Sequence, residues 1–210
     1  MIKKKEDIKK SKGKLGVLIP GIGGAVSTTF IAGVEAVRRK RALPIGSLTQ
    51  MGTIRLGKRD EGRVPYIKDF VDLANIEDLV FCGWDIYKDN CYLAAKKHKV
   101  LEEKAIEELK TFLEGIAPKK GIFNKKYVKN LNGRHIKRLK NNLDLVESIT
   151  EDIEDFKKLH KLERCVMIWC GSTEAYIKPS SIHESLKNFE RGLIKNDPHF
   201  SPSMLYAYSA

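Results

Sequence analysis

Three closely spaced glycines, Gly21, Gly23 and Gly24, follow a short apolar run that ends at Pro20. Beyond them apolar residues recur about once per helical turn, at Val26, Phe30, Val34 and Val37. Glycines let backbone N–H groups approach a phosphate closely, and a helix N-terminus adds a partial positive charge. The stretch from Lys14 to Val37 is therefore predicted to form a strand, a turn and a helix that hold the diphosphate of a dinucleotide. Gly33 is expected on the packed side of that helix.

The glycine motif is incomplete, because Val26 stands where G-x-G-x-x-G has its third glycine. A glycine-rich turn that binds no ligand is as compatible with this stretch alone. A membrane-spanning helix is a second alternative, since Leu15 to Val34 contains no charged residue and follows several lysines. Pro20 and the glycines in its centre argue against a continuous spanning helix.

An acid at the end of the next strand supplies the second candidate contact. The apolar run Leu79 to Cys82 continues into Gly83-Trp84-Asp85-Ile86. In dinucleotide-binding folds the acid that ends the second strand accepts hydrogen bonds from the adenosine ribose. Asp85 fits that position only if Ala42 to Glu77 is an insertion, because the usual interval is roughly 20 residues. A turn or capping role is the alternative for Asp85.

The elements that must position these residues alternate between strands and helices. This predicts an α/β fold of the Rossmann-like, doubly wound type, with a mainly parallel sheet and helices on both faces. Further strands are expected at Lys120 to Phe123 and at Arg164 to Cys170, the latter a buried parallel strand. Further helices are expected at Asn90–His98, Glu102–Gly115, Asn142–Leu159, from the Ser181-x-x-Glu184 capping box to Lys195, and from Ser201 onward. The last strand ends in Gly171-Ser172-Thr173-Glu174, at the sheet edge where ligands bind.

Composition is that of a soluble globular protein of 210 residues, with 42% hydrophobic and 31% charged residues. The net charge of +12 is unevenly spread, with nine Lys/Arg and no acid between Ala117 and Leu143. A solvated or subunit-facing surface is the simplest interpretation of residues 119–140, and phosphate or nucleic-acid contact is the alternative. Residues 1–13 are expected to be a disordered basic tail, and residues 14–210 a single domain with an insertion at about 42–77.

The cysteines and histidines predict neither disulfides nor a metal site. Cys165 and Cys170 flank an apolar strand that would hold them too far apart to bond. All four cysteines are expected to be buried free thiols in a reducing, cytoplasmic compartment. The five histidines show no metal-ligand spacing.

Several motifs together resemble the myo-inositol-1-phosphate synthase family, its bacterial branch most closely. They are Gly21-Ile22-Gly23-Gly24-Ala25-Val26, Gly46-Ser47-Leu48-Thr49-Gln50-Met51-Gly52-Thr53, Gly83-Trp84-Asp85-Ile86, Trp169-Cys170-Gly171-Ser172-Thr173-Glu174 and Ser201-Pro202-Ser203. The resemblance runs from Lys14 to Ala210. It departs from the eukaryotic turn, which has two asparagines and a further glycine where this chain has Ala25, Val26 and Ser27.

The resemblance implies an NAD-dependent isomerase of inositol and phospholipid biosynthesis that converts glucose 6-phosphate to 1D-myo-inositol 3-phosphate. It implies NAD contacts from three stretches: Gly21, Ile22, Gly23, Gly24 and Ala25; Asp85; and Cys170, Gly171, Ser172 and Thr173. The family forms a homotetramer and carries its catalytic lysines further along the chain, so no catalytic residue is expected before Ala210. The uncapped helix at Ala210 predicts that this is the front part of a longer protein, inactive alone. The alternatives are an NAD-dependent dehydrogenase of another substrate and a basic nucleic-acid-binding module.

Overall fold

The computed structural model describes residues 13–69, 71 and 73–210, and its core is a four-stranded parallel sheet. The strands are β1 (Leu15–Pro20), β2 (Leu79–Asp85), β3 (Lys119–Lys120) and β4 (Arg164–Met167), in the order β3-β2-β1-β4. This is the first part of the 3-2-1-4-5-6 order of dinucleotide-binding folds. The predicted doubly wound α/β fold is confirmed. Its switch point lies between β1 and β4, where the strand order reverses.

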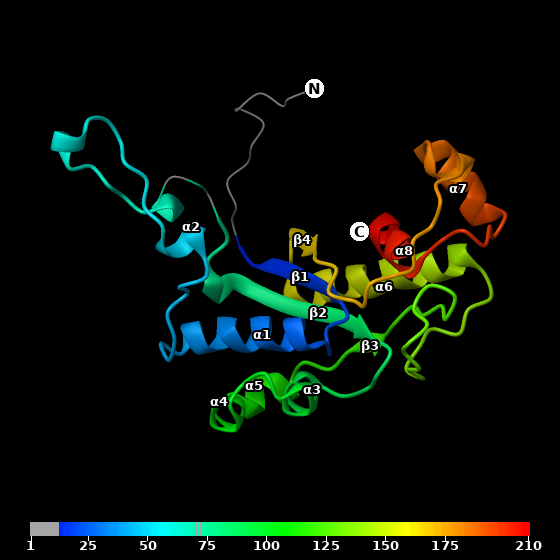
Figure 1. Ribbon diagram of the computed structural model, residues 1–210, viewed down its shortest axis with the longest axis horizontal. Coiled ribbons are helices and arrows are strands. Elements are labelled where there is room, and N and C mark those ends of the chain that lie inside the picture. Colours follow the sequence, from blue (N-terminus) through cyan, green and yellow to red (C-terminus); the bar gives the residue numbers. More distant parts are fainter. Residues whose placement is uncertain (1–12, 70, 72) are drawn as a thin grey trace.

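Helices cover both faces of the sheet (Figure 1). One face packs against α1 (Ala25–Arg38), α3 (Cys91–His98), α4 (Glu103–Glu108) and α5 (Lys110–Glu114). The other packs against α6 (Asn142–His160), α7 (Leu186–Ile194) and α8 (Pro202–Ser209). Successive residues of β1 alternate between the two cores: Val17 and Ile19 face α1, and Leu18 faces α6. The central strands are therefore buried on both sides, which explains their apolar sequences.

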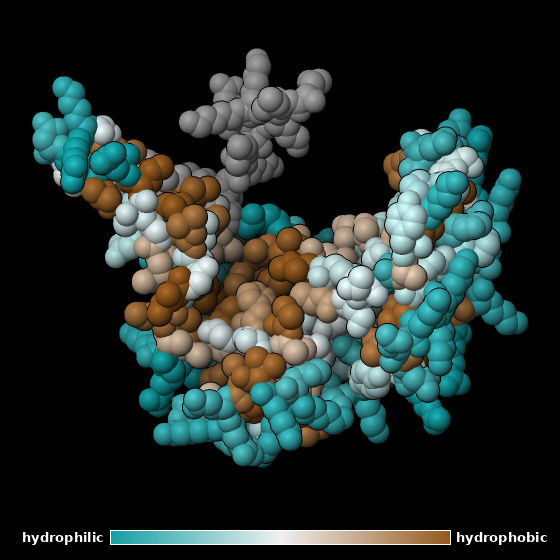
Figure 2. All heavy atoms as spheres, viewed as in Figure 1, coloured by the Kyte–Doolittle hydropathy of each residue, from teal (hydrophilic) through white to brown (hydrophobic). Residues whose placement is uncertain are grey.

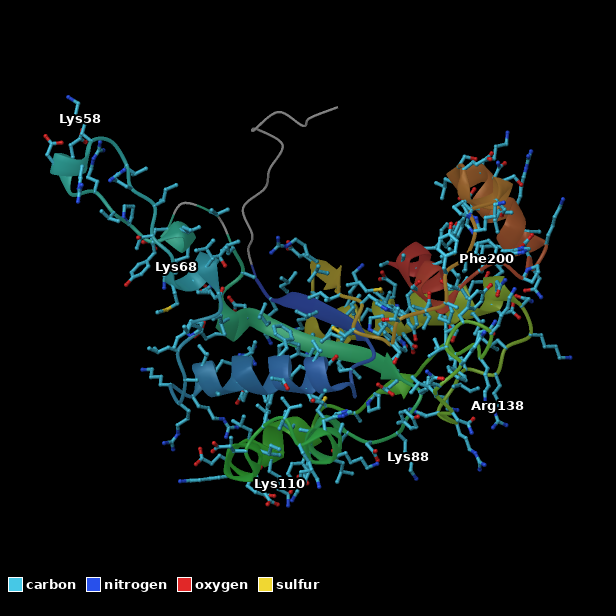
Figure 3. The ribbon with its side chains drawn as sticks, viewed as in Figure 1. Lys58, Lys68, Lys88, Lys110, Arg138 and Phe200 are labelled. Carbon is cyan, nitrogen blue, oxygen red and sulfur yellow. The ribbon has the colours of Figure 1, made fainter. Side chains whose placement is uncertain are left out.

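A long arm separates α1 from β2. It contains α2 (Leu48–Met51) and the 3₁₀ turns η2 (Arg59–Glu61), η3 (Ile67–Asp69) and η4 (Ile76–Asp78). Its two sides are joined by an antiparallel bridge between Thr53 and Tyr66 and by backbone hydrogen bonds from the Ile54 N–H to Pro65 and from the Leu56 N–H to Arg63. The arm projects from the sheet, with Lys58 at its tip (Figures 1 and 3). It exposes apolar side chains at Leu43, Ile45, Leu48, Met51, Ile54, Val64 and Tyr66, and Figure 2 shows a hollow between it and the helices at the other end of the sheet.

The packing prediction for Gly33 is wrong, and the apolar residues of α1 mark its buried face only in part, since Val34 packs against the core and Val26 does not. The buried face of α1 is Ser27, Thr28, Ile31 and Ala32, whereas Val26 is 70% exposed. Gly33 also faces solvent, with nothing within 4 Å of an added Cβ, so it does not bring the helix closer to the sheet. The polar residues are buried because their hydroxyl groups bond to backbone carbonyls at the start of the helix.

Strand β4 also departs from the prediction. It ends at Met167 rather than Cys170, and it is an edge strand with Val166 42% exposed. An apolar run cannot distinguish a central strand from an edge strand, because that depends on neighbours elsewhere in the chain. Backbone pairing with β1 nevertheless continues beyond it, since the N–H groups of Ile168 and Cys170 donate to Leu18 and Pro20.

Other element boundaries differ in smaller ways. The helix predicted at Glu102–Gly115 is divided at Leu109 into α4 and α5. Strand β3 begins at Lys119, and only a bridge from Gly121 to Ile136 follows it. The cap of α7 is Ser185, not Ser181, because its hydroxyl accepts from the Asn188 N–H. Capping signals in a serine-rich segment are ambiguous from sequence because each serine fits the same pattern.

The first residues of the chain lie outside this description. The predicted basic tail at 1–13 falls on residues 1–12, which are not described, and on Gly13. Within the described ranges no helix is both long enough and apolar enough to cross a membrane.

A partly buried ionic cluster joins β2, β3 and α6. Asp152 accepts hydrogen bonds from the Trp84 indole (2.7 Å) and the Lys119 ammonium (3.1 Å), and it pairs with Lys137 (2.7 Å). Lys137 also donates to the Ser148 hydroxyl. Two of the basic residues in the 119–140 stretch therefore point inward. Burial opposes ionisation of Asp152, but the hydrogen bonds from Lys137, Trp84 and Lys119 outweigh it and lower the pKa of this carboxyl.

Replacement of that carboxylate tests the cluster. Asp152→Asn should lower the free energy of unfolding at pH 7 by about 1–3 kcal/mol, because charge-assisted bonds to two lysines are lost. A carboxyl with a lowered native pKa stabilises the fold fully above its ordinary pKa of about 4, and that contribution disappears as the pH falls through the native value. Urea unfolding at pH 7 and pH 3 should show the gap between wild type and variant narrowing at pH 3. Glu151→Gln, on the exposed side of α6, is the matched control, and an equal loss in both variants would contradict the role of Asp152.

Candidate cofactor site

The glycine turn is wedged between the ends of β2 and β4. Gly21 adopts a left-handed conformation, with φ of +84°, and a Cβ there would lie 2.7 Å from the Cys170 carbonyl carbon. The N–H groups of Gly21 and Ile22 both donate to the Trp84 carbonyl, at 2.8 and 3.3 Å. Only glycine fits this position, because an L-side chain would be strained in conformation and would collide with backbone.

The backbone of Gly23 is held from two sides. Its N–H donates to Asp85 Oδ2 at 2.9 Å, and its carbonyl accepts from His98 Nε2 at 2.7 Å. The Gly24 N–H donates back to the Gly21 carbonyl at 3.0 Å. The N–H groups of residues 21–24 are therefore all bonded within the protein. Free donors for an anion must come from the next residues.

Those donors lie in the first turn of α1. Gly24 is the N-cap, and its position has no side-chain cap and no acid in the turn that follows. In the described part of the chain, the N–H groups of Ala25, Val26 and Ser27 have no hydrogen-bond acceptor. Together with the helix dipole, such groups form an anion site. The free donors thus lie just beyond the glycines singled out from sequence.

Two hydroxyl side chains fix this helix start to the turn, and sequence reasoning missed them. Ser27 Oγ donates to the Gly21 carbonyl at 2.7 Å, and Thr28 Oγ1 donates to the Gly24 carbonyl at 3.0 Å. Both residues are at most 1% exposed. The available signal was a pair of hydroxyl residues in the first helical turn, directly after a glycine cap.

Asp85 ends β2 beside the glycine turn, as the sequence predicted. Its second carboxylate oxygen, Oδ1, accepts from the Tyr87 N–H at 3.0 Å, and the residue is 9% exposed. Each oxygen has accepted one hydrogen bond, so each retains a lone pair for a ligand hydroxyl. Asp85 borders a cavity of about 350 Å³ that also reaches Gly21, Gly23 and Gly24.

The loop after β4 closes the same cavity from the other side of the switch point. Cys170, Gly171 and Ser172 line it, whereas Thr173 does not. Glu174 lies at its edge, where its carboxylate accepts from the Ser203 N–H and hydroxyl and so caps α8. Of the predicted contacts, Ile22 is fully buried in the core and can offer only backbone atoms.

Aromatic side chains form the apolar wall of the cavity. Trp84, Trp169 and Tyr206 pack together there, with ring centroids 5.3 Å apart for Trp84–Tyr206 and 5.9 Å for Trp169–Tyr206. Burial raises the pKa of the Tyr206 hydroxyl, which accepts from the Ile122 N–H and stays protonated. Burial also raises the pKa of Cys91, beneath the turn, to about 12. No cluster of three potential metal ligands occurs among the residues described.

Comparison with known protein families identifies the family of this chain. An NAD-binding family model described as myo-inositol-1-phosphate synthase matches residues 15–210. The chain belongs to this family. The resemblance inferred from the sequence motifs is confirmed, and NAD is the cofactor of the matched domain.

Individual members of the inositol-phosphate synthase family agree. Inositol-3-phosphate synthase 1 of Bacteroides thetaiotaomicron is 45% identical over 207 residues, which cover 98% of this chain and 48% of that protein. Inositol-3-phosphate synthase 1 of Oryza sativa subsp. japonica is 34% identical, over 92% of this chain and 41% of that protein. The crystal structure of inositol-3-phosphate synthase from Caenorhabditis elegans superimposes with a TM-score of 0.88 at 27% identity, covering 95% of this chain and 42% of that one. The chain spans about half the length of these relatives or less.

The cradle around Gly21 can be tested by adding one methyl group. Gly21→Ala should lower the free energy of unfolding by about 1–3 kcal/mol and abolish NAD binding, because the residue must keep φ positive and would contact the Cys170 backbone. Gly33→Ala is the matched control in the same stretch. It should raise the free energy of unfolding by about 0.5–1 kcal/mol, since Gly33 lies on the exposed face of α1 with open space around it. Urea unfolding measures the stability of each variant, and calorimetric titration measures its affinity for NAD. Wild-type affinity for NAD in Gly21→Ala would refute the role of this turn in cofactor binding.

Proposed function

We propose that this chain is the NAD-binding portion of an inositol-3-phosphate synthase, which converts glucose 6-phosphate to 1D-myo-inositol 3-phosphate. The observation that carries the proposal is the hydrogen bond between the Gly23 N–H and Asp85, across 62 positions of the chain. It places the predicted ribose-binding acid against the predicted diphosphate turn. Membership of the inositol-phosphate synthase family supports the assignment of this reaction.

In this proposal the cofactor spans the carboxyl ends of β2, β1 and β4. The N–H groups of Ala25, Val26 and Ser27 hold the diphosphate, and Asp85 accepts hydrogen bonds from the adenosine ribose. Cys170, Gly171 and Ser172 border the half of the cavity beyond the switch point, where the nicotinamide would lie. NAD supplies a reversible hydride acceptor for the sugar, and the aromatic wall keeps water from that part of the site.

Residues beyond this chain would complete the enzyme. The family's lysines that stabilise anionic oxygens on the sugar have no counterpart assigned in the cavity, whose lining includes a single lysine, Lys97. Lys97 pairs with Asp89 at the mouth of the site. We therefore propose no catalytic residue among residues 13–69, 71 and 73–210.

The nucleotide preference tests the role assigned to Asp85. Wild type should bind NAD at least about tenfold more tightly than NADP, because a 2′-phosphate would face the carboxylate. Asp85→Asn keeps an acceptor for the Gly23 N–H but loses the charge, so it should narrow this preference while binding NAD more weakly. Asp85→Ala should weaken NAD binding about 10- to 100-fold, since both the ribose contact and the turn contact are lost. Calorimetry with both nucleotides measures this, and an unchanged affinity in Asp85→Ala would remove Asp85 from the site.

Activity of the isolated chain tests the second part of the proposal. Purified protein with NAD and glucose 6-phosphate should form no inositol phosphate, as measured by phosphorus NMR of the reaction mixture. Inositol phosphate formation above the no-enzyme control would show that the catalytic groups lie within these 210 residues. Net accumulation of NADH would instead mark a dehydrogenase, because the synthase reaction returns its hydride to the sugar.

A further inference from the structure

We propose that His98 is a positioning residue for the cofactor diphosphate: by holding the Gly23 carbonyl, it keeps the first turn of α1 open for the anion. This rests on the proposed NAD site and adds a residue that neither the sequence motifs nor the family model assigns a role. His98 is the last residue of α3, 75 positions from Gly23, and it lines the cavity.

The geometry fixes the direction of the contact. A carbonyl oxygen can only accept, so the 2.7 Å contact requires His98 Nε2 to carry a hydrogen and donate it. Nδ1 has no partner in the described part of the chain and is not needed for the contact. The ring is exposed, so its removal would not open a cavity in the core.

The Gly23 carbonyl has a second potential donor, and His98 decides between the two. In a regular α-helix each carbonyl accepts from the N–H four residues later, which for Gly23 is the N–H of Ser27. That bond is not formed, whereas the next one, from Thr28 N–H to the Gly24 carbonyl, is present at 3.0 Å. The helix therefore starts one residue later than it would if the Gly23 carbonyl turned inward. Because His98 holds this carbonyl outward, the Ser27 N–H remains available to an anion.

Helix α3 is well placed to act in this way, since it touches the turn at both ends. Its first residue, Cys91, directs its thiol toward the Ile22 carbonyl at 3.9 Å, and its last residue holds Gly23. Asp85 holds the other side of the same residue through the Gly23 N–H, in the preceding peptide unit. Gly23 is thus fixed between β2 and α3, and its orientation sets the start of α1.

The experiment compares His98→Leu with His98→Gln in the whole chain. Leucine removes the donor, whereas the glutamine side-chain amide can place an N–H near the position of Nε2. Titration calorimetry measures the affinities for NAD and for ADP-ribose, both of which contain the diphosphate. NMR titration measures the affinity for adenosine, which lacks the diphosphate. Thermal unfolding checks that each variant is folded.

We expect His98→Leu to weaken NAD and ADP-ribose binding roughly three- to tenfold, the effect of one hydrogen bond, and to leave adenosine binding unchanged. His98→Gln should restore most of the loss. Equal affinities in wild type and His98→Leu, an equal loss for adenosine, or no restoration by glutamine would each overturn the inference. Failure of wild type itself to bind NAD would instead overturn the proposed cofactor site, so the two failures are distinguishable.

Discussion

The hydrogen bond from the Gly23 N–H to Asp85 is the contact on which the site depends. It requires the chain leaving β1 to turn directly over the end of β2, and this is possible only where backbone meets backbone without an intervening side chain. Gly21 meets that requirement against Cys170, and the Trp84 carbonyl accepts from the two N–H groups that follow Pro20. Three strand ends are thereby held together at one edge of the sheet. The first turn of α1 is left with free donors because the preceding carbonyls and N–H groups are already bonded.

The opposite core holds β2 in place for this contact. Trp84 lies one residue before Asp85, and its indole is fixed by Asp152 from α6. Lys119 and Lys137 neutralise that carboxylate from either end of the segment that follows α5. Because the side chains of Asp152 and Lys137 are mostly shielded from solvent, removal of Asp152 would leave the Lys137 charge partly desolvated, which is costlier than loss of a surface ion pair. The basic stretch at 119–140 is thus partly structural, while Arg138 remains exposed (Figure 3).

The two flanks of the molecule expose more apolar surface than its central strands. The arm and the edge strand β4 carry exposed apolar residues, among them Ile45 and Val166, whereas the central strands are covered on both faces. The hollow between the arm and α7 is visible in Figure 2. The chain continues from β4 through α7 to α8. Glu174, in the loop after β4, caps the N-terminus of α8. Through this contact the cofactor-facing loop and the last helix of the chain are joined.

The sequence alone determined the fold class and the family, and it predicted that the glycine turn and Asp85 lie at one edge of the sheet. Regular spacing of apolar residues along the chain predicts strands and helices, and the glycine turn with Asp85 predicts the ligand edge, because these are local or nearly local properties.

Only the tertiary structure decided which groups are free to bind. The N–H groups of Gly21, Gly23 and Gly24 are already bonded to β2 or within the turn, and Val26, the first apolar residue of the α1 pattern, faces solvent. His98, Ser27 and Asp152 gained their roles from residues distant in the sequence or from backbone atoms, which no side-chain pattern records. Whether a backbone N–H is free depends on which acceptors lie near it in the folded chain, so its availability cannot be predicted from residue types and spacing.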